Sequence, residues 1–244
     1  MLRFIIAGLW TVFFLILSLP LILVTWIIGF FSPRCKSRIS HFVISNAFKV
    51  LLKLAGVKID FVGSENVPTD CPVLYCPNHR SIFDIIMTYT KVPGPTGYVA
   101  KKETRKVPIF NIWMNFIHCQ FLDRSDLRQG LKVILNCCEL IKSGISVCIF
   151  PEGTRNKSEA TLLPFHDGSF KIAEKTGCPI VPVAIVNSAE IFENHLPKLK
   201  PVHVIIEYCE PIYTKDMDRA QMKGLSEQVY KIIEETYNRN LSKI

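Results

Sequence analysis

No charged side chain occurs between Phe4 and Pro33, although the rest of the sequence has an ordinary soluble composition. The run exceeds the about 20 apolar residues that a helix needs to cross a hydrocarbon core, which argues against a wholly water-exposed N-terminus. It is also too long for a secretory signal peptide, and no small-x-small cleavage site follows it. The sequence therefore predicts a membrane segment over residues 1–33.

Pro20 divides this run into two shorter apolar stretches. A proline inside a helix removes a backbone donor and crowds the preceding turn, so we expect a kink or break there. The pattern is compatible with one kinked span and with two short helices that enter and leave the same leaflet. Only Arg3 precedes the run, whereas Arg34, Lys36 and Arg38 follow it, and for a true span this asymmetry places the following domain on the cytoplasmic side.

The sequence also lacks any pair of cysteines with CxxC spacing, and its nine cysteines are an odd number. These features argue against a zinc site and a disulfide framework, and they are typical of buried free thiols in a reducing compartment. No internal repeat or low-complexity segment occurs, and the apolar content of 49% is too high for a disordered chain. We expect one domain with a sizeable core and an appendage.

Basic residues outnumber acidic residues by 29 to 21, which gives a net charge of +8. Such an excess suits nucleic acid, an anionic membrane surface or anionic substrates about equally well. The apolar N-terminus favours membrane lipids, and we expect no nucleic-acid partner. A second apolar stretch, Phe42–Val57, carries Lys49 and Lys53 on one helical face. It is typical of an amphipathic helix on the membrane or against the domain, and a plain core helix is nearly as compatible. We expect a basic helical connector over residues 34–58.

From about residue 59 to residue 244, short apolar runs bounded by turn residues alternate with helical patterns. The clearest helix runs from Ser125, as N-cap, to Ser143, and a closing helix is expected in the last 25 residues. This alternation predicts an α/β fold with a mixed, largely parallel sheet flanked by helices. The strand candidates are Val73–Cys76, Tyr98–Ala100, Cys119–Leu122, Val147–Phe150, Ile180–Val186 and Val202–Tyr208.

His79 and Asp84 follow the first strand candidate, where α/β proteins often place functional groups. On a continuous helix, an offset of five residues sets two side chains about 140° apart, too far around the axis for contact. The two can meet if His79 precedes the helix and Asp84 lies in its first turn, with Ser81 as N-cap. Asp84 would then orient the imidazole and leave its other nitrogen free to act as a general base. The alternative is a capping box of Ser81 and Asp84 beside an ordinary loop histidine.

His118 and Asp123 have the same spacing, so the spacing alone is weak evidence. The stretch between them has the pattern of a strand, in which residues an odd number apart point to opposite faces. The sequence predicts no contact between this second pair.

A second group of polar residues, Glu152, Gly153, Thr154 and Arg155, follows the strand candidate Val147–Phe150. Gly153 permits a close backbone approach, Thr154 offers a hydroxyl, and Arg155 can bind a phosphate through two parallel hydrogen bonds. The alternative is an ordinary Pro-Glu-Gly turn followed by a surface arginine.

Two further basic side chains belong to candidate phosphate sites. Arg124 follows the strand candidate Cys119–Leu122, and Lys101 opens a run with four basic residues in six, Lys101–Lys106. Runs of this kind are usually solvated or face a membrane, so Lys101 has the weaker support.

Four blocks of this sequence resemble those of the glycerolipid acyltransferase family, in family order and at about family spacing. Asn78–Asp84 is similar to the NHxxxxD block and Phe150–Arg155 to the FPEGTR block, while Phe121–Arg124 and Val181–Val183 resemble the remaining two. The resemblance covers roughly residues 40–212. Among the members, the short chain with an apolar N-terminus is most similar to 1-acylglycerol-3-phosphate acyltransferases, which make phosphatidic acid.

The resemblance implies an enzyme that transfers an acyl group from coenzyme A or acyl carrier protein to a lysophospholipid hydroxyl, with the catalytic domain over residues 59–244. It implies that His79 is the base and Asp84 its orienting partner. We expect no cofactor and no metal. The acceptor-binding residues implied by the resemblance are Glu152, Gly153, Thr154 and Arg155, with Arg124 and Lys101 on the phosphate.

Three positions depart from common family usage. Asn156 stands where many members have Ser, Asn111 replaces a frequent Gly, and His166 stands where a Lys often precedes x-Gly. Three alternatives remain open: another acceptor such as glycerol 3-phosphate or a different lysolipid, a catalytically dead membrane-anchored lipid-binding protein, and a covalent route through Cys76 or Ser81. Burial of Cys76 in a strand would raise its pKa and weaken it as a nucleophile.

Overall fold

The computed structural model describes residues 1–123 and 125–244. The helices are α1 (Leu2–Leu17), α2 (Leu19–Phe31), α3 (Pro33–Ala55), α4 (Phe83–Tyr89), α5 (Phe110–Phe116), α6 (Leu127–Lys142), α7 (Lys171–Thr176) and α8 (Arg219–Leu241). The strands are β1 (Lys58–Val62), β2 (Leu74–Pro77), β3 (Thr96–Lys101), β4 (Gln120–Leu122), β5 (Ser146–Cys148), β6 (Ile180–Val186) and β7 (His203–Tyr208). Every strand candidate is therefore confirmed, with ends shifted by one or two residues where they differ.

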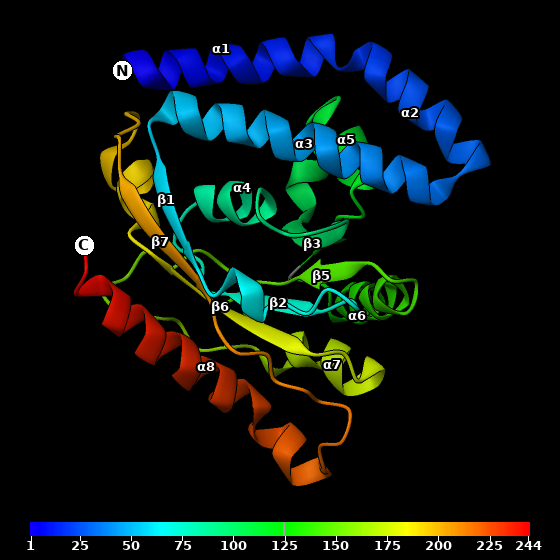
Figure 1. The fold of residues 1–244 in the computed structure, drawn as a ribbon, viewed down its shortest axis with the longest axis vertical. Helices are drawn as coiled ribbons and strands as arrows, with labels where there is room; N and C mark the ends of the chain where they lie inside the picture. The colour runs from blue at the N-terminus through cyan, green and yellow to red at the C-terminus, as the bar shows by residue number, and fades with distance from the viewer. Residues whose placement is uncertain (124) are drawn as a thin grey trace.

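The strands form one seven-stranded sheet in the order β1-β7-β6-β2-β5-β3-β4. All neighbouring pairs are parallel except β6 and β7, which run antiparallel. The predicted α/β fold with a mixed, largely parallel sheet is thus confirmed (Figure 1). Because β2, β5, β3 and β4 share one direction, their carboxyl ends lie along the same edge of the sheet, where ligands of open α/β sheets bind.

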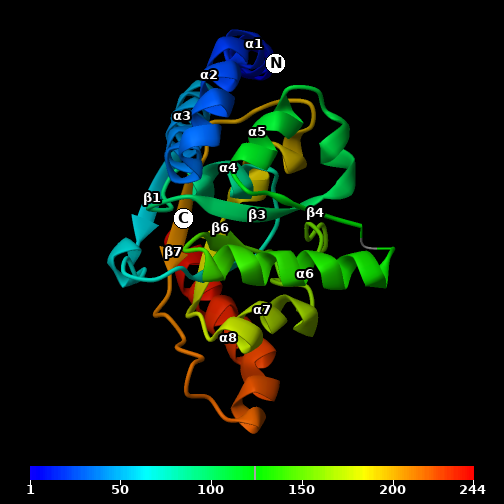
Figure 2. The ribbon, with the colours of Figure 1, turned by 90° about the vertical axis from the view of Figure 1, so that its right-hand side faces the viewer.

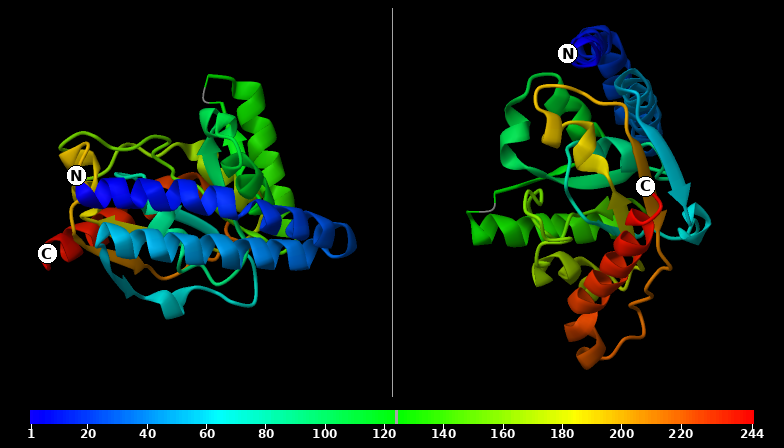
Figure 3. Two further views of the ribbon diagram at one scale, coloured as in Figure 1. Left: turned by 90° about the horizontal axis from the view of Figure 1, so that it is seen from above. Right: turned by 90° about the vertical axis from the view of Figure 1, so that its left-hand side faces the viewer.

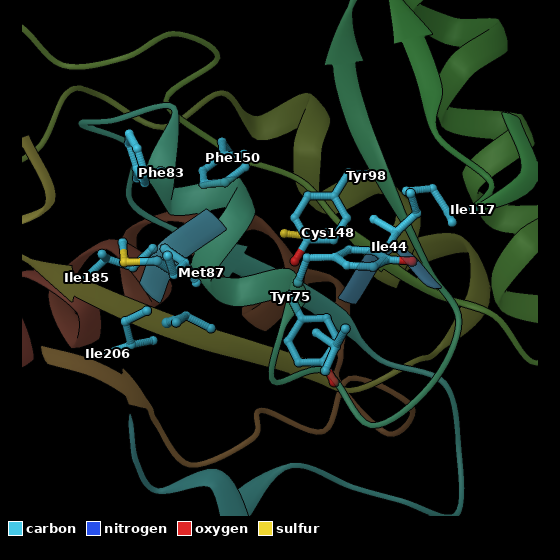
Figure 4. Close-up of a cluster of buried hydrophobic side chains, with 14 of the residues drawn as sticks. Ile44, Tyr75, Phe83, Met87, Tyr98, Ile117, Cys148, Phe150, Ile185 and Ile206 are labelled. Carbon is cyan, nitrogen blue, oxygen red and sulfur yellow. The ribbon is translucent and has the colours of Figure 1, made fainter. Parts of the chain in front are cut away.

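Helices cover both faces of the sheet, and each face has its own buried core (Figure 2). On one face, side chains of β2, β3 and β6 meet those of α3 and α4, as Tyr75, Tyr98, Ile185, Ile44 and Met87 show in Figure 4. On the other face, α6, α7 and α8 pack on the sheet through apolar residues that recur at helical spacing. The sheet is therefore buried on both sides, as parallel sheets generally are.

Helices α1 and α2 form an outer layer over α3 (Figures 1 and 3). They meet at Ser18 with a bend of 47°, and Pro20 lies in the first turn of α2. The predicted break is confirmed. Pro20 is tolerated in the first turn of α2, because the backbone N–H that proline lacks would have no partner within the helix at that position. Among the described helices, none alone is long and apolar enough to cross a membrane, whereas α1 and α2 together satisfy that test by length and composition.

Helix α3 covers most of the expected helical connector over residues 34–58. It begins at Pro33, because the Ser32 hydroxyl accepts a hydrogen bond from Cys35 N (3.3 Å) and Pro33 fits the first turn. Two other local features differ from the sequence-based expectations. Helix α6 is capped by Asp126, whose carboxylate accepts from the next turn, while Ser125 lies outside the helix. Strand β1 was not among the strand candidates, since it lies at the sheet edge and is only half-buried.

Candidate active site

The turn that carries His79 lies between the end of β2 and the start of α4, at the carboxyl edge of the parallel strands. Asn78 fixes the start of this turn. Its buried side chain donates to the Ile185 carbonyl (3.0 Å) and accepts from the Ile185 amide (2.7 Å), which ties the end of β2 to β6. The backbone therefore leaves the sheet at a fixed point immediately before His79.

A single oxygen of Asp84 contacts three residues of the turn that carries His79. Asp84 Oδ2 lies 2.9 Å from His79 Nδ1 and accepts from the backbone amides of Arg80 and Ser81, each at 2.7 Å. Asp84 is fully buried, and its Oδ1 has no hydrogen-bond partner among the described residues. With the carboxylate ionised, His79 Nδ1 must carry a proton, which leaves Nε2 as the basic nitrogen.

The predicted arrangement of a histidine before the helix and an aspartate in its first turn is confirmed. The helix starts at Phe83, however, so Ile82 rather than Ser81 occupies the capping position. The Ser81 hydroxyl still accepts from Phe83 N (3.0 Å), while its amide donates to Asp84. The capping interaction and the His–Asp pair, which are alternatives from the sequence alone, coexist because Asp84 Oδ2 both accepts from the Ser81 amide and contacts His79 Nδ1.

The His79 ring is packed rather than free to rotate. It stacks on Phe150 with ring centroids 4.1 Å apart and an interplanar angle of 28°. His79 is 9% exposed, and no hydrogen bond to its Nε2 occurs among the described residues. Nε2 is therefore available to a substrate hydroxyl.

Glu152 holds the backbone of His79 in place through a hydrogen bond. Its Oε1 accepts from the His79 amide at 2.6 Å and its Oε2 from the Leu163 amide at 2.8 Å, and the residue is only 2% exposed. Burial raises the pKa of Glu152, and the two backbone hydrogen bonds partly oppose that rise. Both carboxylate oxygens already serve the protein backbone, so the geometry favours a positioning role over direct contact with a substrate.

The rest of this loop holds the two motif segments together. The Asn156 amide donates to the His79 carbonyl at 2.7 Å, and the Asn156 side chain binds the backbone of Ser158 and Ala160. Gly153 has a left-handed backbone (φ 67°), and a Cβ there would approach the His166 ring to 2.8 Å. Glycine is required at this turn.

Of the predicted phosphate ligands that the structure describes, Arg155 lies beside the His79 turn. Its Nη1 donates to Glu193 Oε1 at 2.8 Å, and Glu193 also contacts Ser81. Thr154 is exposed on the same loop. Lys101 is exposed at the end of β3, 3.6 Å from Glu103, and no contact among the described residues joins it to His79. Arg124 lies outside the described residues.

The second His–Asp pair is not joined. His118 Nε2 hydrogen-bonds Ser37 Oγ (2.7 Å), while Asp123 pairs with Lys102 and accepts from Ser125. The predicted lack of contact is confirmed, but the reason given from the sequence is wrong. His118 precedes β4 with φ 63° instead of lying in the strand.

Comparisons with known proteins identify a family and several relatives. Residues 58–186, more than half of the chain, match the family model described as Acyltransferase, and the chain belongs to that family. It is 34% identical to the 1-acyl-sn-glycerol-3-phosphate acyltransferase of Borreliella burgdorferi over 65% of this chain and 63% of that protein. It is 29% identical to the Saccharomyces cerevisiae protein of the same name over 80% of this chain and 65% of the relative. The matched segment thus spans less than two thirds of either relative.

A solved structure has the same fold along nearly the whole chain. The crystal structure of the 1-acyl-sn-glycerophosphate (LPA) acyltransferase PlsC from Thermotoga maritima superposes with a TM-score of 0.76 at 23% sequence identity. The superposition covers 97% of this chain and 98% of the other. At this level of identity the similarity establishes the fold.

Proposed function

We propose that this protein transfers a fatty acyl group from a thioester donor, acyl-CoA or acyl carrier protein, to the free hydroxyl of 1-acylglycerol 3-phosphate. The product would be phosphatidic acid. The observation that carries the proposal is the contact of His79 Nδ1 with Asp84 Oδ2 (2.9 Å), which leaves Nε2 without a protein partner among the described residues. The names of the relatives support the choice of acceptor.

In this mechanism His79 Nε2 takes the proton of the acceptor hydroxyl as its oxygen attacks the thioester carbonyl. Asp84 holds the imidazole in the required tautomer and stabilises the imidazolium that forms. The carbon–sulfur bond breaks, the thiolate leaves, and the proton held by His79 neutralises that thiolate. The ester forms in one transfer from donor to acceptor.

A covalent route through a protein nucleophile has less support. Cys76 is fully buried in β2, and burial raises its pKa well above the ordinary value, so little thiolate is present. Ser81 is also fully buried, and its hydroxyl donates to Glu193 (2.6 Å) rather than to the imidazole of His79.

Arg155 is the proposed anchor of the acceptor phosphate, with Arg124, Lys101 and Thr154 as further ligands. Only Nη1 of Arg155 is bonded to Glu193, and its side chain is 40% exposed, so other guanidinium N–H groups remain available for an anion. Glu152 and Gly153 contribute by shaping the loop that presents Arg155.

We also propose that α1 and α2 anchor the enzyme in the membrane, with the catalytic domain on the cytoplasmic side. Many of their large apolar side chains are exposed, including Leu9, Phe13, Trp26 and Phe30. The lysophospholipid acceptor and the product both reside in a bilayer, so an anchor would keep the active site at its substrate. Residues 34–58 would connect this anchor to the catalytic domain.

An acceptor and donor panel tests the proposal. Purified protein in lipid vesicles would receive acyl-CoA or acyl carrier protein with 1-acylglycerol 3-phosphate, glycerol 3-phosphate or lysophosphatidylcholine, and mass spectrometry would identify the ester formed. We expect phosphatidic acid from the first acceptor. Faster acylation of either other acceptor would replace the assignment, and no product from any pair would favour a catalytically dead lipid-binding protein.

A further inference from the structure

A second carboxylate, Glu193, joins the two segments that carry the proposed chemistry. It lies in the short helical turn Glu193–His195 beyond β6, and its side chain is 13% exposed. Its Oε2 accepts from the Ser81 hydroxyl at 2.6 Å. Its Oε1 accepts from the Ile82 amide at 2.9 Å and from Arg155 Nη1 at 2.8 Å. One side chain therefore links the His79–Asp84 turn to the loop of Arg155.

The contact with Ser81 leaves that buried residue fully bonded. The Ser81 oxygen accepts from Phe83 N, so its single hydroxyl proton is available for Glu193. Without Glu193 this donor would be buried and unpaired, which is costly. The Ser81 amide also donates to Asp84, so the chain of contacts runs from Glu193 through Ser81 to Asp84 and His79.

The turn that carries Glu193 is itself held in place. Phe192 stacks on Phe4 of α1 with ring centroids 5.7 Å apart, and Ile191 is fully buried. Glu190 stabilises the same turn through hydrogen bonds to Asn194 (2.5 Å) and His195 (2.8 Å). Glu193 is thus fixed from a part of the chain that belongs to neither motif segment.

We propose that Glu193 is a positioning residue for acyl transfer: it sets the Ser81–Ile82 corner that presents Asp84, and it aims Arg155 at the acceptor phosphate. The inference rests on the proposed function. Glu193 acts through two contacts, which have separable effects. The Ser81–Ile82 contact governs turnover through Asp84, whereas the Arg155 contact governs affinity for the phosphorylated acceptor.

Steady-state kinetics of Glu193→Ala and Glu193→Gln test this division. Loss of charge-assisted hydrogen bonds should lower the kcat of Glu193→Ala by about 10- to 100-fold. The acceptor KM should rise while the donor KM stays constant. Glutamine keeps an oxygen for the Ile82 amide but loses the charge opposite Arg155, and its NH2 group cannot accept from the Ser81 hydroxyl. Glu193→Gln should therefore recover part of the kcat and retain the raised acceptor KM.

Glu190→Ala is the matched control for a general loosening of the turn, because Glu190, in the preceding turn Ser188–Ile191, bonds Asn194 and His195 but contacts neither motif segment among the described residues. A merely structural effect would lower kcat alike in both alanine variants and leave both KM values unchanged. That result, or an unchanged acceptor KM in Glu193→Gln, would overturn the inference.

Amide hydrogen exchange supplies a readout that needs no activity. Exchange at Ile82 should accelerate in Glu193→Ala and remain at the wild-type rate in Glu190→Ala, since only the first removes the acceptor of that amide. If the wild type acylates none of the acceptors, the proposed function fails and exchange alone decides on the contact. Unchanged exchange at Ile82 would refute the positioning role even in an active enzyme.

Discussion

At the scale of single residues, the proposed base His79 depends on one carboxylate oxygen of Asp84 that has three hydrogen-bond partners. Asp84 Oδ2 contacts His79 Nδ1 and accepts from two backbone amides, and Asp84 itself is fully buried. Hydrogen bonds to an ionised group in a buried site are stronger than those in solvent. The geometry therefore makes Asp84 an orienting partner of His79, with the role of base left to the imidazole.

The first prediction compares Asp84→Asn with Asp123→Asn, because each aspartate follows a histidine at the same spacing. An amide at Asp84 would orient the imidazole less reliably and stabilise its protonated form less, so turnover should fall severely. Asp123 contacts Lys102 and Ser125 instead of a histidine, so its variant should be much milder. Turnover would be measured at saturating substrate, with thermal melts to exclude misfolding. Loss of turnover in Asp123→Asn alone would contradict the assignment of His79 and Asp84 as the catalytic pair.

The second prediction concerns Glu152→Gln. An amide has one oxygen for the two backbone donors of His79 and Leu163, so the loop should loosen and turnover should fall by about tenfold. Because burial raises the pKa of Glu152 in the folded state, its ionisation opposes folding as the pH rises above the ordinary carboxyl pKa. The stability of the variant relative to wild type should accordingly improve from acid to neutral pH.

Thermal melts across that pH range and kcat at neutral pH check this prediction. Glu159→Gln is the control, since Glu159 is exposed in the following loop. A relative stability that does not change with pH would contradict the assigned cause of the pKa shift.

At the scale of elements, the sequence predicts most of the framework because its signals are local. Apolar runs bounded by turn residues locate six of the seven strands, and Pro20 marks the break between α1 and α2. The ends of elements are less predictable where two side chains compete. Asp126 caps α6 although Ser125 is one residue earlier, because the Ser125 hydroxyl bonds Asp123 instead.

The candidate site divides in the same way. His79, Asp84 and Arg155 follow strand ends, so their grouping can be expected from the topology of a parallel sheet. Glu193 has no such signal, because its role depends on how the chain after β6 folds back across two distant loops. The sequence predicts Glu152 in the site but does not predict its burial, because tertiary packing decides whether a loop carboxylate is buried.

The third prediction tests the outer layer formed by α1 and α2. Leu9 and Phe13 are 66% and 55% exposed, so replacing both with Lys leaves the packing on α3 largely intact. Inserting lysines into a bilayer is costly, and the fraction bound to vesicles should fall by about tenfold or more. The control is Leu131→Lys, a similarly exposed leucine (58%) on α6. Equal sedimentation of both variants with vesicles would assign the anchor to another surface.

At the scale of the whole molecule, the sheet separates two cores and encloses most of the thiols. Seven of the nine cysteines are buried, Cys71 is half-buried and Cys35 is exposed. Burial raises the pKa of Cys119 to about 12, and partial burial with nearby Asp70 raises the pKa of Cys71. The buried thiols predicted from the sequence are thus observed, and the reducing compartment stays a prediction.

The fourth prediction follows from that distribution. A maleimide or disulfide reagent at neutral pH should label Cys35 promptly and Cys71 slowly, because the thiolate is the reactive form. The remaining seven should react only on unfolding. Mass spectrometry of tryptic peptides over time would count them. Prompt labelling of Cys76 in the native protein would contradict its place in the core.

The most direct test of the central claim is the rate of acyl transfer by His79→Ala, with His203→Ala as its control. His203 forms a second close His–Asp contact, with Asp60 at 2.8 Å, but it joins β7 to β1 rather than facing the site. Folded protein of each variant would be assayed for phosphatidic acid from 1-acylglycerol 3-phosphate and an acyl thioester. Loss of a general base predicts a decrease of about 10²- to 10⁴-fold for His79→Ala. His203→Ala should retain nearly full activity. Near-normal turnover by His79→Ala would contradict the account.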